Sequence, residues 1–252
     1  MKRFIVMTMF LLLSLCRYPG TAPAAGPFGP PEPFTEAKGG IHTAIGYTYK
    51  KDCYENGVER IFTQNIFYSE LGRGFARYFE LYGRFGIADL EVGNVTRISD
   101  ELQTSEDFND NWQFTGTLGV KGYYPLSEIF GVGAFLQGTY SFGDYRDDVR
   151  GTFNGVAFTS EYYIENPWDV NAGIALQAHV TSGIKVYTGA YLYHSEAKIS
   201  LLPYIPESTL KNETRIGGFA GFNIPIGRGF QLNLESQFAK RVSAGMAIVL
   251  VH

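Results

Sequence analysis

The clearest structural pattern in the sequence lies in residues 112–124, which read WQFTGTLGVKGYY. Apolar side chains or glycine occupy every second position from Trp112 to Tyr124, while polar residues such as Gln113 and Lys121 fall between them. Side chains alternate between the two faces of a β-strand with a period of two, whereas a helical face repeats every 3.6 residues. The segment is therefore predicted to be a β-strand with one apolar and one polar face.

The same alternation recurs along the chain from about residue 40. Seven more segments show it clearly, at residues 41–49, 79–87, 132–142, 168–180, 184–193, 216–226 and 230–238. Residues 61–70 and 243–251 are apolar in both registers, and a β-bulge is expected in the first of them. Ten strands is an even number, which is typical of single-chain bacterial barrels. The sequence thus predicts an all-β fold, a closed antiparallel up-and-down transmembrane β-barrel of ten strands; a barrel of eight would require two weaker segments to be lost.

The connections between these segments alternate in length, which orients the barrel. Short turns are expected at residues 71–74, 125–127, 181–183 and 227–229. Longer, polar and often acidic connections are expected at about residues 50–59, 90–110, 143–167 and 197–213. Outer-membrane barrels have short turns in the periplasm and long loops outside the cell. The long connections are therefore predicted to face the exterior.

The N-terminal region is divided from the barrel by its composition. Residues 1–24 are predicted to be a signal peptide, because Lys2 and Arg3 precede an apolar run that ends before the small-residue pattern at 22–24. Residues 25–39 are predicted to be a periplasmic leader. The four prolines within residues 26–34 lack backbone N–H groups and favour an extended linker. Residues 40–252 then form the barrel.

Charge and cysteine content limit the partners. Without the three basic residues of the signal region the chain has 18 basic and 25 acidic residues, a net charge of −7, which argues against nucleic acid. Only Cys53 remains after cleavage, so no intramolecular disulfide is expected. Cys53 is predicted to lie in the first outer loop, either as a reactive thiol or as an ordinary loop residue.

The apolar faces are predicted to point toward lipid. They carry almost no charge over 9–13 residues, and a tilted strand needs about 9–11 to cross a bilayer. Aromatic residues such as Trp112, Tyr140 and Trp168 fall near strand ends, where interfacial girdles occur. A soluble lipocalin-like barrel is the alternative. The predicted location is the outer membrane, with membrane lipids and the barrel-assembly machinery as partners, extracellular ligands at the loops, and a monomeric state.

The inward faces are predicted to carry a network of charged side chains. Its expected members are Glu80, Arg84, Lys121, Asp169, Lys185, Arg215 and Glu235. A barrel of this size leaves little lumen, and buried charges require partners. We therefore expect ion pairs that brace a largely filled lumen; a narrow pore is the alternative. No cofactor or metal is expected, because His42 and His179, both predicted to face inward, supply only two ligands.

In this pattern the chain resembles the small outer-membrane barrels of the OmpA and OmpX type and their ten-stranded relatives, over about residues 40–252 and without a diagnostic motif. The resemblance implies an integral membrane barrel with a structural or surface-interaction role. Some such barrels are hydrolases that act on lipid A or on peptides, and His194, Ser195 and Glu196 contain the residue types of a base, a nucleophile and an acid. Alternation places Ser195 on the face opposite the other two, so an enzyme is the lesser alternative.

Overall fold

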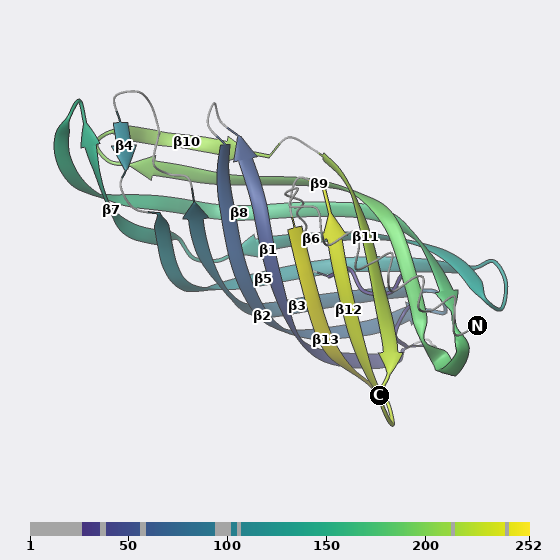
Figure 1. Cartoon of the computed structure of the whole chain (residues 1–252). Helices are drawn as coiled ribbons and strands as arrows, with labels where there is room; N and C mark the ends of the chain where they lie inside the picture. The colour runs from purple at the N-terminus through teal and green to yellow at the C-terminus, as the bar shows by residue number, and fades with distance from the viewer. Residues whose placement is uncertain are drawn as a thin grey trace.

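The computed structural model describes residues 27–35, 39–55, 59–93, 102–104, 107–212, 215–239 and 242–252. Ten of its strands form a closed barrel (Figure 1). They are β1 (Ile41–Glu55), β2 (Glu59–Ala76), β3 (Phe79–Gly93), β5 (Phe108–Pro125), β6 (Phe130–Ser141), β8 (Val156–His179), β9 (Lys185–Leu201), β11 (Arg215–Pro225), β12 (Phe230–Phe238) and β13 (Val242–Val251). Each pairs antiparallel with the next, and β13 pairs with β1 to complete the circle. The ten-stranded barrel is confirmed.

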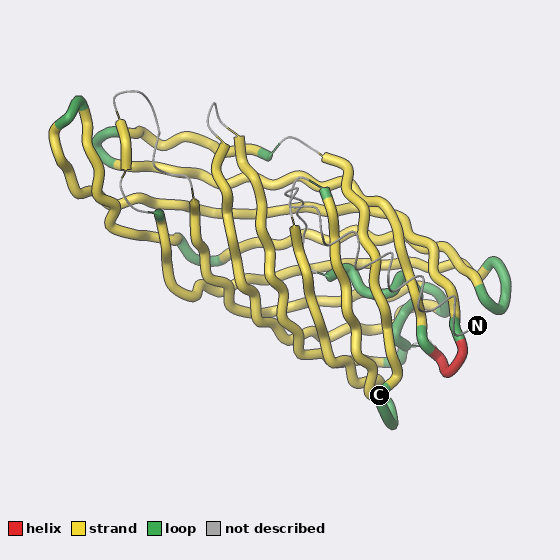
Figure 2. The backbone as a smooth tube through the Cα atoms, in the orientation of Figure 1, coloured by secondary structure: helices red, strands yellow, loops and turns green. Residues whose placement is uncertain are grey.

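Three further strands extend the wall beyond the barrel. They are β4 (Leu102–Thr104), β7 (Tyr145–Phe153) and β10 (Ile205–Lys211). β7 pairs with residues 156–164 of β8, β10 pairs with residues 196–201 of β9, and β4 pairs with β7. We call these strands and the paired parts of β8 and β9 the outer extension, which projects from the upper left of the barrel (Figures 1 and 2).

Several predicted connections are therefore wrong. Residues 143–167 and 197–213 form mainly strands, because hydrogen bonding between neighbouring strands continues past the apolar segments. β1 likewise continues to Glu55, so Cys53 lies buried in a strand and not in a loop. The first tight turn lies at residues 77–78 because β2 continues to Ala76. The signal peptide predicted for residues 1–24 lies outside the described residues.

No helix among the described residues is long and apolar enough to cross a membrane.

Apolar side chains cover the outside of the barrel. They are strongly exposed to their surroundings; examples are Ile45, Leu71, Phe85, Phe114, Leu118, Leu136, Ile174, Leu176, Leu192, Ile216 and Ile248. A water-soluble protein rarely exposes a continuous apolar surface of this extent. A closed barrel satisfies its backbone hydrogen bonds within the sheet, as a bilayer requires. The protein is thus an integral outer-membrane β-barrel; we call the end with the tight turns the periplasmic end and the opposite end the outer end, after the usual arrangement of such barrels.

Rings on the inner wall lie across glycines of the neighbouring strand. In each case the ring and the glycine are directly opposite in the register, and a β-carbon on the glycine would come within 2.0–2.8 Å of the ring. These pairs are His42 with Gly72, Tyr68 with Gly46, Tyr82 with Gly119, Phe135 with Gly173, Tyr187 with Gly221, Tyr191 with Gly217 and Phe219 with Gly189. The glycines leave the space in which the rings lie flat against the wall.

The two segments with apolar residues in both registers are regular strands. Across residues 61–70 the register with β1 and β3 stays constant, so the expected bulge is wrong. Phe62 faces inward there because it belongs to an apolar core at the outer end of the barrel. Val249 in β13 faces inward because it packs against Phe34 of the N-terminal segment. Phe62 and Val249 therefore each face inward to pack in a specific apolar cluster.

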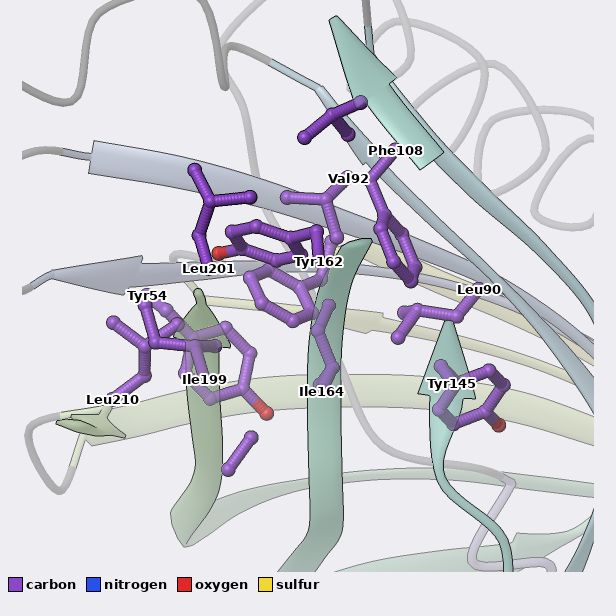
Figure 3. Packing of buried hydrophobic residues seen from close by; sticks show 13 residues of the cluster. Tyr54, Leu90, Val92, Phe108, Tyr145, Tyr162, Ile164, Ile199, Leu201 and Leu210 are labelled. Atoms are coloured by element: carbon purple, nitrogen blue, oxygen red, sulfur yellow. The ribbon is translucent and has the colours of Figure 1, made fainter. Parts of the chain in front are cut away.

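The outer end of the barrel is closed by an apolar core. Its buried members are Tyr54, Phe62, Leu90, Val92, Phe108, Tyr145, Val149, Tyr162, Ile164, Ala197, Ile199, Leu201 and Leu210. Figure 3 shows the side chains of Phe108, Tyr162 and Leu90 gathered between the strands. The core combines the ends of barrel strands with the inner face of the outer extension. The inner wall at the outer end is thus apolar, in contrast to the polar wall around Lys50 and Asp169 in the middle of the barrel.

Candidate functional site

An N-terminal segment lies inside the periplasmic half of the lumen. Residues 27–35 have no helix or strand, yet Phe28 and Phe34 are almost completely buried. The Phe28 ring stacks on Phe135 with 3.9 Å between ring centroids. It also contacts the edges of Tyr191 and Phe219, each at 5.1 Å. The sequence predicted only an extended leader here; its two aromatic residues among the prolines are the one signal of a docked segment.

Two wall carboxylates accept hydrogen bonds from the backbone of this segment. Glu235 of β12 accepts from the N–H groups of Phe28 and Gly29, each at 2.9 Å. Glu80 of β3 accepts from the N–H of Phe34, also at 2.9 Å. Bonds to an ionised acceptor are stronger than neutral ones. The wall therefore holds the segment through its main chain.

A third carboxylate belongs to the segment itself. Glu32 lies 2.7 Å from the ammonium of Lys185 and 3.1 Å from Nε2 of His179. The side-chain amide of Gln177 donates to the same carboxylate at 2.7 Å. These contacts fix the middle of the segment to β8 and β9 near the periplasmic end.

Next to the segment, charged side chains form a chain of alternating sign. Glu80 lies 2.8 Å from the ammonium of Lys121 and 3.4 Å from Nδ1 of His42. The other nitrogen of His42 lies 2.8 Å from Glu70, which also pairs with Arg84. Each charge thus has a neighbour of opposite sign or a hydrogen-bonding imidazole, which offsets the cost of removing it from water.

The middle of the lumen is polar and narrow. Lys50 lies 2.8 Å from Asp169, to which Asn171 donates at 2.7 Å. Two cavities lie beside this pair, both lined in part by Thr115 and Thr139, and each offers about 30 Å³. That space suits single water molecules.

The predicted charge network divides into separate groups. Glu80 and Lys121 pair directly, and Arg84 is linked to them through Glu70 and His42. Asp169 pairs with Lys50, and Lys185 pairs with Glu32. Glu235 binds backbone amides instead, and the side chain of Arg215 lies outside the described residues.

Three partners were missed by the sequence analysis. Lys50 is the inward position that follows Thr48 in the alternation, and this signal was available. Glu70 lay in the stretch whose faces were not assigned. Glu32 lies in the leader, so no wall pattern includes it.

The candidate hydrolase residues do not converge. Nε2 of His194 lies 3.1 Å from Glu196 on the outside of β9, and Glu196 also pairs with Lys211 at 3.0 Å. Ser195 faces inward, with its hydroxyl 3.4 Å from a carboxylate oxygen of Asp52. The hydroxyl and the imidazole are therefore on opposite sides of the wall. Within the described ranges no three His, Cys, Asp or Glu side chains are arranged to hold a metal ion.

The chain was compared with known proteins. No protein-family model matches it. No curated protein matches it in sequence. Among solved structures it is similar to the translocator domain of the autotransporter NalP from Neisseria meningitidis, with 10% identity, a TM-score of 0.46, and coverage of 87% of this chain and 90% of that one.

Two further outer-membrane proteins show comparable values. The COG4313 outer membrane channel from Pseudomonas putida F1 has 13% identity and a TM-score of 0.46, with 91% and 100% of the two chains covered. The outer membrane protease OmpT from Escherichia coli has 8% identity and a TM-score of 0.46, with 88% and 98% covered. At these values the likeness is to a general architecture and indicates nothing about activity.

Proposed function

We propose that the protein is a sealed outer-membrane barrel that acts in surface interaction through its outer extension. The observation that carries this proposal is the apolar core, in which Phe108, Tyr145 and Tyr162 are fully buried across the outer mouth. Such a core makes the extension a rigid part of the barrel, unlike a set of mobile loops. The segment of residues 27–35 occupies the other end of the lumen, so a pore is the less favoured role.

The tip of the outer extension offers an apolar contact surface. Val156, the first residue of β8, is 70% exposed, and Leu202, in the turn between β9 and β10, is 59% exposed. Behind them the Phe158 and Tyr204 rings lie 4.3 Å apart between centroids. Phe153, 37% exposed, also contacts Tyr204, so these side chains form one apolar patch, and exposed apolar patches mark sites of contact with another surface.

Two measurements test this function. The purified protein in planar lipid bilayers is expected to show no steady conductance above that of lipid alone, and a stable open level would contradict the sealed lumen. Cells that display the protein are expected to adhere to hexadecane droplets, and Val156→Asp to reduce adhesion. Thr159→Asp, on the polar outer face of β8, is the matched control; equal adhesion of both variants and wild type would refute the role of the tip.

Nothing in the geometry favours the hydrolase alternative, since Ser195 and His194 face opposite sides of the wall. His194→Ala is accordingly expected to leave unchanged any turnover measured with peptide or lipid A substrates.

A further inference from the structure

We propose that the periplasmic half of the lumen is a recognition site for an extended, proline-rich peptide, and that residues 27–35 are the ligand that fills it in cis. This inference concerns the end of the barrel opposite the outer extension and does not depend on the surface role.

The wall provides acceptors for the main chain of the segment. Because four prolines lack N–H groups, residues 27–35 have five backbone donors. Four of them are bound by side chains of the wall: Phe28 and Gly29 by Glu235, Glu32 by Gln177 and Phe34 by Glu80. A segment without helix or strand normally leaves such donors to water. Side-chain acceptors at these positions are what a peptide-binding groove requires.

The wall is also shaped around the prolines. A β-carbon on Gly245 would lie 2.2 Å from Cγ of Pro27, and one on Gly133 would lie 2.5 Å from Cβ of Pro31. Any other residue at these two wall positions would displace the segment. The missing side chains of Gly133 and Gly245 therefore make two shallow pockets, each filled by a pyrrolidine ring.

Separate pockets receive the remaining side chains. Phe28 enters an aromatic pocket formed with Phe135, Tyr191 and Phe219. Phe34 packs against Ala44, Ala247 and Val249, and the ammonium of Lys121 lies 4.2 Å from its ring centroid. Glu32 meets the basic pair of Lys185 and His179. The site thus selects a proline and an aromatic residue, followed by Gly-Pro-Pro, an acid, a further proline and a second aromatic residue.

Glu235 is the wall residue that most needs this ligand. It is 4% exposed, and none of the ion pairs formed by the described residues includes it. Two of its hydrogen bonds come from the segment; Tyr187 at 3.0 Å and Gln237 supply others. A carboxyl group buried in a protein is costly without such hydrogen-bonding partners. Loss of the segment would leave both of its oxygens without their backbone donors, which favours an occupied site.

Cutting the folded full-length protein separates the ligand from the tether. A protease site inserted between Thr35 and Gly39 is cleaved after the barrel has folded with its segment in place. The freed peptide is expected to stay bound through gel filtration in detergent, and to exchange slowly with a fluorescein-labelled synthetic peptide of residues 26–38. Immediate and complete release from the wild-type barrel would overturn the proposal.

Substitutions in the barrel wall then test the contacts with the segment. Glu235→Gln is expected to speed dissociation by roughly tenfold or more, because Phe28 and Gly29 donate to different oxygens of Glu235 and the amide of Gln keeps only one acceptor oxygen. Glu196→Gln, on the outer surface of β9, is the matched control and should leave the rate unchanged. Equal rates in the two variants would refute the assigned role of Glu235, and heat-modifiable migration on gels verifies that each barrel is folded.

A peptide-side test leaves the barrel untouched. The synthetic peptide with Phe28→Ala is expected to compete roughly tenfold or more weakly than the natural peptide, because it no longer fills the aromatic pocket. A peptide of the same composition in scrambled order is expected not to compete. If the scrambled peptide competed as well as the natural one, the lumen would be an unselective cavity and the proposal would be wrong.

Discussion

Replacing Gly217 by alanine tests how tightly the rings pack on the inner wall. A β-carbon there would lie 2.4 Å from Cζ of Tyr191 and 2.6 Å from its hydroxyl oxygen. The ring is held in place by Phe28, so it has little room to move. Overpacking of this kind costs about 1–3 kcal/mol. The neighbouring Gly218 faces outward, and a β-carbon there would meet nothing closer than 3.6 Å.

Replacing glycine by alanine also reduces the conformational entropy of the unfolded chain, which stabilises the folded protein by about 0.4–1 kcal/mol. This contribution is the same in both variants and cancels when they are compared. Gly217→Ala is therefore expected to unfold with a free energy about 1–3 kcal/mol below that of Gly218→Ala. Guanidinium titration in lipid vesicles, followed by fluorescence of Trp112 and Trp168, measures the difference.

A third variant separates the ring from other effects at the same position. In a Tyr191→Ala background the added methyl group has no ring to meet, so the cost of Gly217→Ala should disappear. If the two alanine variants were equally stable, or if the cost persisted without the ring, the packing argument would be wrong.

Three further predictions concern other levels of the lumen. Lys50→Met removes the cation 2.8 Å from Asp169 and should lower the free energy of unfolding by about 3–5 kcal/mol in the same titration; an unchanged value would show that the pair contributes nothing. Phe108→Ala empties a fully buried position of the outer core and should cost about 3–5 kcal/mol, with proteases on intact cells cutting the outer extension that they spare in wild type. The Cys53 thiol, 8% exposed, should react with a maleimide far more slowly in the folded barrel than after unfolding in guanidinium; equal rates would contradict its position in β1.

The alternation of apolar and polar residues predicted the barrel because every side chain that faces lipid must be apolar. Phe114 and Leu118 were placed outward from the sequence and are exposed on the barrel surface. The inward positions follow no single rule, since the polarity of the lumen changes along the barrel axis. Phe62 belongs to the outer apolar core and Glu70 to the charged chain, although both lie in one strand on one face. A periodic pattern predicts which face of the strand a residue is on, but not its position along the barrel axis.

The N-terminal segment shows a second limit. Glu80 and Glu235 were predicted to face the lumen, but their partnership with backbone amides of Phe28, Gly29 and Phe34 joins residues 46 to 207 positions apart. The prolines that marked the segment as a linker also fit it to the glycines of the wall. Composition describes the local conformation of such a segment, while its position depends on contacts with distant strands.

The ring and glycine pairs of the inner wall have a consequence for how the strands find their alignment. Five of the seven lie between β3 and β5, β6 and β8, or β9 and β11, the neighbours that are joined by long connections, and the other two lie between β1 and β2. Where two strands are joined by a tight turn, the turn itself sets the alignment. A long connection sets no such limit, and a slip of two residues keeps every side chain on its own face. In the five pairs at long connections a slipped ring would meet a side chain where the native pairing offers a glycine, so these five pairs specify the alignment at the joints where no tight turn does.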